Sequence, residues 1–289
     1  MRISLPKSII RKIQRAVVEF ELLAPGDKVL VGLSGGKDST ALALYMRDRV
    51  VELEYVFCDT EKELIETYEY LEKLEVYLGK PIKRITPDIG FDDLLEKRRN
   101  FLPSPQIRWC TEYLKIKPFE KFIGDDAVIM YVGIRADEPH RKGYISTKHN
   151  IHARFPFVED GLRLRDIMRI LEDSQLGLPD YYRWRSRSGC FFCFYQQRRE
   201  WVGLLETHPH LFQEAMRYER RDPVTGETYT WVQGESLADL ARPERVGQIK
   251  ADFEKRRAGE NNMMKEGSLF SVFEMQCADE HAGCVICHL

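Results

Sequence analysis

The sequence has no long apolar run, and this absence limits where the protein is expected to act. No stretch of its 289 residues approaches the roughly 20 apolar residues that a membrane-spanning helix needs. The opening residues, Met1-Arg2-Ile3-Ser4-Leu5-Pro6, also lack the apolar core and small-residue cleavage site of a signal peptide. We therefore expect a cytoplasmic protein without membrane contacts.

An excess of charge of one sign is also missing. The chain carries 44 Lys and Arg against 46 Asp and Glu, a formal net charge of -2, so no overall positive field attracts nucleic acid. Cysteine is present, with seven residues, but the cytosol keeps thiols reduced, so structural disulfides are not expected. The composition therefore favours metal binding or sulfur chemistry for these thiols.

Short apolar runs alternate with helical segments in the first half of the chain. Four β-rich runs, at 28–33, 53–58, 82–85 and 128–132, are separated by segments long enough for helical crossovers. The clearest crossover spans 61–78, where the apolar residues fall on one helical face. This alternation predicts an α/β fold, a doubly wound parallel sheet with its ligand site at the carboxyl ends of the strands.

Past residue 143 the alternation gives way to helical patterns, at 161–174, 196–206, 209–220 and 237–257. We interpret the chain as four parts. They are an N-terminal helix (1–24), an α/β domain (25–160), a helical C-terminal subdomain with a Cys-x-x-Cys unit (161–260) and a Cys-rich tail (261–289).

The first predicted strand ends in a glycine turn that opens a helix, Ser34-Gly35-Gly36-Lys37-Asp38-Ser39. Two glycines let the backbone approach a phosphate closely, the amides at the helix start point at the anion, and the Lys37 ammonium and the Ser34 and Ser39 hydroxyls add donors. Asp38 is a candidate ligand for a Mg²⁺ ion that neutralises a leaving pyrophosphate. A plain glycine turn capped by Ser and Asp is the alternative. The spacing fits neither a Walker loop nor the dinucleotide fingerprint.

The turn resembles the pyrophosphate-binding loop of the PP-loop ATP pyrophosphatase superfamily, which includes phosphoadenosine phosphosulfate reductases and thiolation enzymes. This resemblance implies an adenine nucleotide alpha-hydrolase-like fold that binds ATP and cleaves it between the α- and β-phosphates. It extends to Asp59-Thr60 after the second strand and to Gly133-Ile134-Arg135, with Arg141, after the fourth. It implies nucleotide contacts by these residues and catalytic roles for Lys37, Asp38 and Arg135.

Three of these residues have simpler explanations. Asp59 and Thr60 suit a cap for the following helix, and Arg141 suits a surface ion pair. For Arg135 the planar guanidinium favours bidentate contacts to an oxyanion.

Three cysteines repeat the order of the iron-sulfur adenosine phosphosulfate reductases. The 79 residues between Cys110 and the Cys190-x-x-Cys193 unit are similar in number to those between the Cys-Cys pair and the Cys-x-x-Cys of those enzymes. Here Cys110 stands alone between Trp109 and Thr111, which leaves three ligands. The resemblance implies a 4Fe-4S cluster with Cys284 or Cys287 as the fourth ligand; zinc and free thiols are the alternatives.

The tail cysteines also suit another task, because a thiolate on a mobile segment can carry sulfur from a donor to an activated acceptor. We keep Cys284 and Cys287 as candidate sulfur carriers. Cys58 ends an apolar strand and is interpreted as packed.

The segment Arg108-Trp109-Cys110-Thr111, with Lys115 to Pro118 and the Gly-Cys-x-x-Cys unit, resembles the ATP pyrophosphatases of DNA phosphorothioation, DndC and SspD. That resemblance implies adenylation of a DNA backbone phosphate oxygen and its replacement by sulfur. The implied partners are a cysteine desulfurase, DNA and other phosphorothioation proteins. Sulfonucleotide reduction and thiolation of tRNA, with RNA as the substrate, remain alternatives.

Local residues are compatible with a nucleic-acid substrate. Cations interleave with an aromatic ring at 183–187, before the Cys-x-x-Cys unit, and Arg198-Arg199 with Trp201 follow it. A solvent-exposed helix face with a buried tryptophan is an alternative explanation for the same residues.

Overall fold

The computed structural model describes residues 28–50, 52–141, 143, 146, 148–221, 226 and 228–261. The predicted N-terminal helix at 1–24 lies outside the described residues. So do the tail beyond residue 261 and its cysteines Cys277, Cys284 and Cys287.

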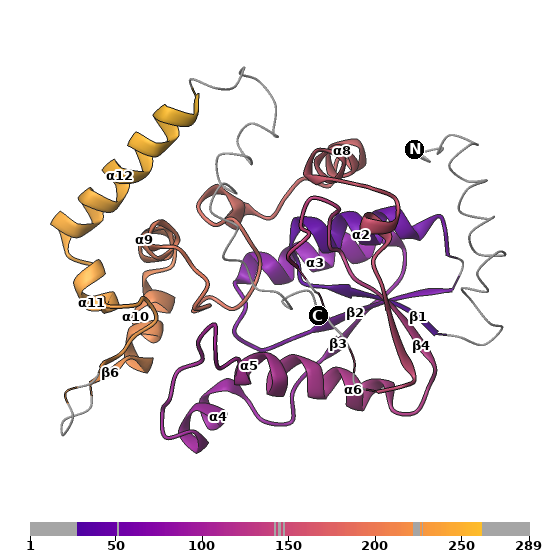
Figure 1. The fold of residues 1–289 in the computed structure, drawn as a ribbon, viewed down its shortest axis with the longest axis horizontal. Coiled ribbons are helices and arrows are strands. Elements are labelled where there is room, and N and C mark those ends of the chain that lie inside the picture. Colours follow the sequence, from indigo (N-terminus) through magenta and orange to yellow (C-terminus); the bar gives the residue numbers. More distant parts are fainter. Residues whose placement is uncertain are drawn as a thin grey trace.

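Five parallel strands form the central sheet, in the order β3-β2-β1-β4-β5 (Figure 1). Strands β1 (Lys28–Leu33), β2 (Leu53–Cys58), β3 (Ile82–Ile85) and β4 (Val128–Tyr131) lie within one residue of the predicted runs, whereas β5 (Ile151–Arg154) was not predicted. The chain winds outward from β1 to β3 and places β4 and β5 on the other side, so the winding reverses between β1 and β4. The carboxyl ends of these two strands are where such a sheet binds its ligand.

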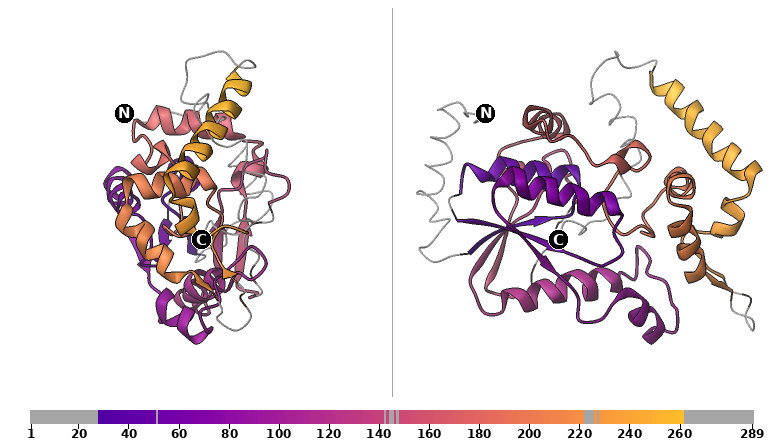
Figure 2. Two further views of the ribbon diagram at one scale, coloured as in Figure 1. Left: turned by 90° about the vertical axis from the view of Figure 1, so that its left-hand side faces the viewer. Right: turned by 180° about the vertical axis from the view of Figure 1, so that it is seen from behind.

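Helices cover both faces of the sheet (Figures 1 and 2). On one face lie α2 (Lys37–Arg47), α3 (Ile65–Leu78) and α8 (Leu164–Ser174); on the other lie α4 (Phe91–Lys97), α5 (Trp109–Thr111), the π-helical turn η1 (Glu112–Ile116) and α6 (Lys117–Ile123). The side chains of β1 alternate between the two faces, because Val29, Val31 and Leu33 join the larger core whereas Leu30 packs with Phe119 of α6. This confirms the predicted doubly wound α/β fold.

The rest of the described chain is mostly helical. It comprises α7 (Pro156–Glu159), the 3-10 turn η2 (Asp180–Arg183), α9 (Arg198–Thr207), α10 (Pro209–Tyr218), α11 (Leu237–Leu240) and α12 (Pro243–Asn261), with a short hairpin of β6 (Arg220–Arg221) and β7 (Thr228–Tyr229). The single helix predicted at 237–257 is two helices, because Pro243 lacks an amide hydrogen and starts a new helix.

Aromatic side chains attach this helical part to the sheet domain. The Phe192 ring lies 4.2 Å from the Phe91 ring of α4 and stacks on Trp231 at 5.1 Å, centroid to centroid. The Cys-x-x-Cys unit, which contains Phe192, is therefore held between α4 and the C-terminal helices.

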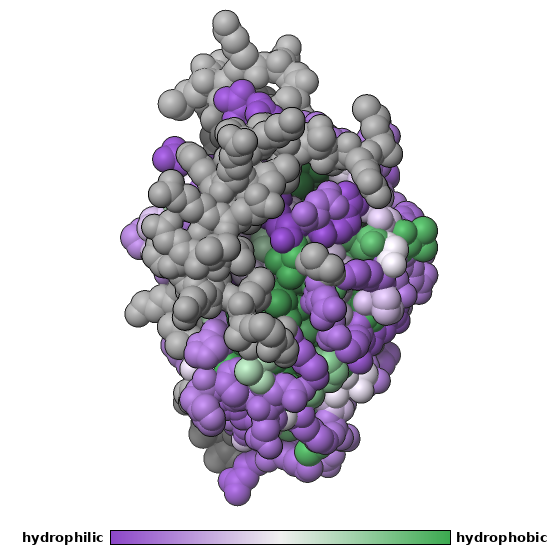
Figure 3. Space-filling model, turned by 90° about the vertical axis from the view of Figure 1, so that its right-hand side faces the viewer, coloured by the Kyte–Doolittle hydropathy of each residue, from purple (hydrophilic) through white to green (hydrophobic). Residues whose placement is uncertain are grey.

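Most of the coloured surface in Figure 3 is hydrophilic, and hydrophobic residues come to the surface in a strip near its middle. No helix within the described ranges has both the length and the apolar character needed to cross a membrane.

Candidate functional site

The glycine turn lies at the carboxyl end of β1 and leads directly into α2. Gly35 has φ +72, in the left-handed region that favours glycine, and a Cβ there would stand 2.6 Å from Thr67 Cγ2. The Ser39 hydroxyl accepts a hydrogen bond from the Ser34 amide at 3.1 Å and donates one to the Gly36 carbonyl at 3.2 Å. The turn is thus a tightly specified loop, unlike the flexible glycine turn considered as an alternative.

Gly133, after β4, fits closely against this loop. A Cβ at Gly133 would lie 3.0 Å from the Asp38 carbonyl oxygen, so its lack of a side chain allows the end of β4 to approach the first turn of α2. The two segments meet at the point where the winding of the sheet reverses.

Three charged side chains are buried beside the loop. Arg135 donates to Asp38 Oδ1 at 2.9 Å, and the Lys37 ammonium lies 3.4 Å from Asp38 Oδ2; all three residues are 5% exposed or less. Burial raises the pKa of Asp38, but the charges of Lys37, Arg135 and Arg141 outweigh it and lower that pKa to about 2. Asp38 is therefore ionised at neutral pH and orients both cations. The predicted Mg²⁺ contact of Asp38 stays a prediction.

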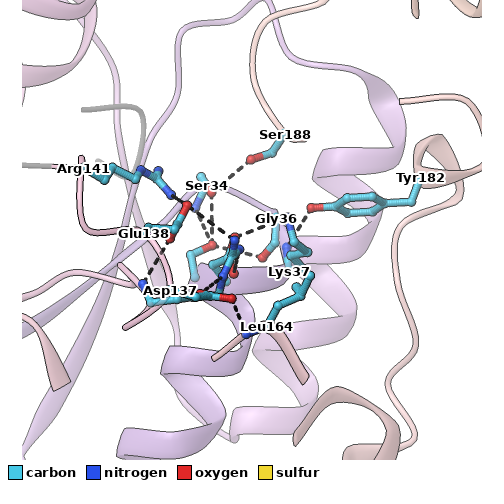
Figure 4. Close-up of polar contacts among 12 residues, drawn as sticks. Ser34, Gly36, Lys37, Asp137, Glu138, Arg141, Leu164, Tyr182 and Ser188 are labelled. Carbon is cyan, nitrogen blue, oxygen red and sulfur yellow. Dashed lines mark hydrogen bonds and ion pairs between the residues drawn. The ribbon is translucent and has the colours of Figure 1, made fainter. Parts of the chain in front are cut away.

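A second layer of carboxylates holds Arg135 (Figure 4). Its Nε donates to Asp137 at 2.9 Å, and Asp137 in turn accepts from the Leu164 amide at the start of α8. Glu138 accepts from the Arg135 amide at 3.0 Å and pairs with Arg141 at 2.7 Å. Arg141 is 15% exposed in this network, so it is part of the site's charge arrangement and not a solvent-exposed surface pair.

Residues 181–188, which the sequence reasoning did not connect to the loop, cover it. The Lys37 amide donates to the Tyr182 hydroxyl at 2.8 Å, and the Ser188 hydroxyl donates to Ser34 Oγ at 3.0 Å (Figure 4). The Tyr181 hydroxyl donates to the Gly35 carbonyl at 2.8 Å. These contacts join residues 145 to 154 positions apart in the chain, so no local sequence pattern predicts them.

The polar residues after β2, Asp59 and Thr60, form hydrogen bonds with neighbouring side chains and backbone, and Thr60 also contacts Cys190. Asp59 Oδ1 accepts from the Glu61 amide at 2.8 Å and from the Tyr68 hydroxyl at 2.7 Å. The Thr60 hydroxyl lies 3.2 Å from Glu63 Oε1 and 3.2 Å from Cys190 Sγ. The strand end therefore reaches the Cys-x-x-Cys unit.

The three described candidate ligands, Cys110, Cys190 and Cys193, lie in one partly buried region. Burial, with a smaller effect of the Cys193 thiol, raises the pKa of Cys110 to about 11, and burial also raises the pKa of Cys190. Burial lowers the pKa of the nearby Lys115 ammonium, but the negative groups around it, first Glu63 and then Cys190, outweigh this and raise that pKa. Cys58 is buried apart from solvent, and burial raises its pKa to about 12, as its interpretation as a packed residue requires.

The thiols alone do not form a metal site. Soft sulfur donors suit iron or zinc, but among the residues that the structure describes no three His, Cys, Asp or Glu side chains converge closely enough to hold an ion. The predicted cluster, with its fourth ligand at Cys284 or Cys287, therefore stays a prediction.

The basic-aromatic segments singled out in the sequence are partly internal and partly exposed. Arg185 and Trp201 are 0% exposed, and the side chain of Arg183 is 81% exposed and pairs with Asp180. Arg185 donates to the carbonyls of Gly189 and Cys190 at 2.8 and 2.9 Å, so it shapes the Cys-x-x-Cys unit and has no access to nucleic acid. The buried-tryptophan alternative is confirmed for Trp201.

Comparison with known proteins agrees with this geometry. Residues 28–159 match the family model of the phosphoadenosine phosphosulfate reductase domain. This part of the chain belongs to the PP-loop ATP pyrophosphatase superfamily. The match confirms the superfamily predicted from the loop and places this PP-loop domain in an enzyme family that acts on nucleotides. It does not single out the DNA phosphorothioation proteins.

Two curated relatives match part of the chain. An uncharacterized protein of Methanocaldococcus jannaschii is 28% identical over 200 residues, which cover 64% of this chain and 40% of that protein. The adenosine 5'-phosphosulfate reductase of Staphylococcus haemolyticus is 26% identical over 123 residues, 42% of this chain and 50% of that enzyme. The chain thus matches half or less of the length of these relatives. Among solved structures, phosphoadenylyl-sulfate reductase from Candida auris is 14% identical with a TM-score of 0.46, covering 66% of this chain and 98% of that one.

Substituting Gly35 tests how tightly the loop is specified. In Gly35→Ala, the left-handed backbone costs about 1–2 kcal/mol and the contact with Thr67 adds about 1–3 kcal/mol. Urea unfolding of Gly35→Ala should therefore show a larger loss than that of Gly79→Ala, because Gly79 has φ +65 but nothing within 4 Å of its added Cβ. Thr67→Ser, which removes the colliding methyl group, should return Gly35→Ala to the level of Gly79→Ala. Equal losses in all three would show that the loop has room for a side chain.

Proposed function

We propose that the protein binds ATP on the loop at 34–39, transfers adenylate to an oxygen of a nucleic acid and prepares that position for sulfur. The substrate oxygen in this proposal is a non-bridging oxygen of a DNA backbone phosphate, and the modification is DNA phosphorothioation. A cysteine desulfurase and other phosphorothioation proteins are the proposed partners.

The first step is adenylation. The substrate oxygen attacks the α-phosphorus of ATP, the bond from that phosphorus to the bridging α–β oxygen breaks, and pyrophosphate leaves. The loop amides and the Lys37 ammonium bind the departing phosphates, while Asp38 and Arg135 hold Lys37 and the phosphate end in place. Mg²⁺ bound with the triphosphate supplies further charge neutralisation.

The second step exchanges AMP for sulfur. A persulfide supplied by the desulfurase attacks the adenylated phosphorus with its terminal sulfur, and AMP leaves. A second thiol then attacks the carrier sulfur, which frees the phosphorothioate and leaves a disulfide, so atoms and electrons balance. Cys284 and Cys287 are the candidate carriers. In the free-thiol alternative to the cluster, Cys190 and Cys193 supply a further pair of thiols near the loop.

One contact supports this proposal most directly. Ser188, which lies two residues before Cys190, donates a hydrogen bond from its hydroxyl to Ser34 Oγ at 3.0 Å. Together with the Thr60–Cys190 contact of 3.2 Å, it brings the phosphate loop and the thiols to the same edge of the sheet. An enzyme that activates an oxygen and then delivers sulfur needs these two groups side by side.

Sulfonucleotide reduction is the second candidate, because the matching family model and the Staphylococcus haemolyticus relative carry that description. It uses the same phosphate loop for the substrate's own phosphates and makes sulfite. It requires no cleavage of ATP, so the two functions give different products from different substrates.

The test is to incubate the full chain with ATP labelled at the α- and γ-phosphates, in the presence and absence of oligodeoxynucleotide. The proposal predicts the γ label in pyrophosphate and the α label on the oligonucleotide, or in AMP once water hydrolyses the adenylate, with both products increased by the oligonucleotide. Release of orthophosphate alone would contradict adenylate transfer. Sulfite formed from adenosine phosphosulfate or its 3'-phosphate with a dithiol reductant, without pyrophosphate from ATP, would establish the reductase instead. Stimulation by tRNA but not by DNA would move the substrate to RNA.

A further inference from the structure

A row of arginines and tyrosines borders the cysteines. It consists of Arg98, Arg108, Tyr113, Arg187 and Tyr195, which we call the basic-aromatic strip. The guanidinium carbons of Arg187 and Arg108 lie 4.9 and 5.9 Å from the centre of the Tyr195 ring, and that of Arg98 lies 5.1 Å from the centre of the Tyr113 ring. All five side chains are partly exposed, in contrast to the buried Arg185 and Trp201.

Several residues of the basic-aromatic strip lie within three positions of a candidate ligand cysteine along the chain, some before it and some after it. Arg108 comes two residues before Cys110, Arg187 three before Cys190, and Tyr195 two after Cys193. Burial raises the pKa of the Tyr195 hydroxyl; the charges of Arg108 and Arg187 act against this increase, and the Cys193 and Cys110 thiols add to it. A ligand held on Tyr195 therefore lies next to the thiols.

The strip also keeps positive charge. Arg187 and Arg98 form no ion pair with a carboxylate in the described part of the chain, and their recorded partners are aromatic rings. Arginines elsewhere are neutralised, such as Arg154 by Glu159 and Arg245 by Glu235. A guanidinium resting on a ring face retains its N–H donors for phosphate oxygens.

We propose that the basic-aromatic strip binds a single-stranded segment of nucleic acid and leads it to the cysteines, with phosphates on the arginines and unpaired bases on the tyrosine rings. This inference rests on the proposed function and names how the substrate of that site is held. A base stacks on a tyrosine face only when it is out of a duplex, so the strip selects a single or locally opened strand. Each ring has two cations beside it, Arg187 and Arg108 at Tyr195, and Arg98 and Lys117 at Tyr113. Two such rings offer more contacts than a mononucleotide uses.

The test is fluorescence anisotropy of a labelled oligodeoxynucleotide of about 20 residues, without ATP, on the full chain. The single strand should bind more tightly than a duplex of the same sequence. Tyr195→Ala should weaken binding roughly 5- to 150-fold, and Tyr195→Phe, which keeps the ring, should bind as the wild type does. Arg187→Ala should lower the slope of log affinity against log salt by about 0.7.

Arg183→Ala is the matched control, since Arg183 is four residues from Arg187, more exposed and paired with Asp180, and it should leave affinity and salt slope unchanged. Thermal unfolding of each variant shows whether it is folded. The strip assignment is wrong if duplex and single strand bind equally, or if Arg187→Ala and Tyr195→Ala behave as Arg183→Ala does. Full competition by AMP at the same affinity would also overturn it.

Because ATP is absent, this result is independent of the pyrophosphate assay. Strand binding that depends on the strip, without pyrophosphate release, would overturn the proposed chemistry and leave the strip in place. Tighter binding of the matching oligoribonucleotide would support the strip and overturn DNA as the substrate.

Discussion

Lys37→Met is expected to reduce pyrophosphate release from ATP about 10²- to 10³-fold while the protein stays folded. The Lys37 ammonium is buried at the start of α2, where a departing pyrophosphate would gather negative charge. Loss of one preorganised donor at such a position typically costs this much in kcat. Asp38 keeps its 2.9 Å pair with Arg135 in the variant, so its carboxylate is not left without a cation.

The measurement is the rate of pyrophosphate formation at saturating and at low ATP. A fall in kcat locates the role of Lys37 in the transition state, whereas a rise in KM alone would mean that it only binds ATP. Lys121→Met is the control, because Lys121 is 70% exposed and pairs with Asp88 on the surface. Normal turnover by Lys37→Met would remove this residue from the catalytic site.

The elements that the sequence predicted are those whose signal is local. Strands β1, β2 and β4 are mostly buried runs rich in apolar residues, whereas β3 keeps only Ile82 and Ile85 buried. The glycine turn follows β1 directly. Strand β5 was not predicted because only one of its four residues, Ile151, is buried. The strand lies at the edge of the sheet and pairs with β4 alone. Its conformation comes from the partner strand and not from its own pattern.

The site residues also divide into those that local sequence signals predicted and those that only the folded structure brings to the site. Lys37, Asp38 and Arg135 were identifiable because each follows a strand end, and parallel strands bring these ends to one edge. Tyr182, Ser188 and Glu63 were missed because only the folded chain brings them to the loop or to Cys190. The predicted nucleic-acid contact of residues 183–187 does not hold for every residue, because the sequence does not distinguish the buried Arg185 from the partly exposed Arg187.

Arg185→Met is expected to destabilise the protein by about 3 kcal/mol and to loosen the Cys-x-x-Cys unit. The wild-type guanidinium donates to two carbonyls, at Gly189 and Cys190, from a position that is 0% exposed. Removing it leaves buried acceptors without a charged donor, which costs about 1–3 kcal/mol for each. Gly189, with φ +132, sits at the bend that these bonds stabilise.

Two measurements separate an effect on the fold from an effect on the thiols. Urea unfolding reports the stability loss, and the rate of iodoacetamide labelling at Cys190, followed by mass spectrometry under native conditions, reports access to the thiol. Arg183→Met should change neither by much, because its exposed pair with Asp180 contributes about 0–1 kcal/mol. Arg185→Lys should fall between wild type and Arg185→Met, since one ammonium lacks the planar fork that reaches both carbonyls. If Arg185→Met lowers stability but leaves labelling of Cys190 unchanged in the folded protein, then Phe192 and its aromatic contacts hold the Cys-x-x-Cys unit instead.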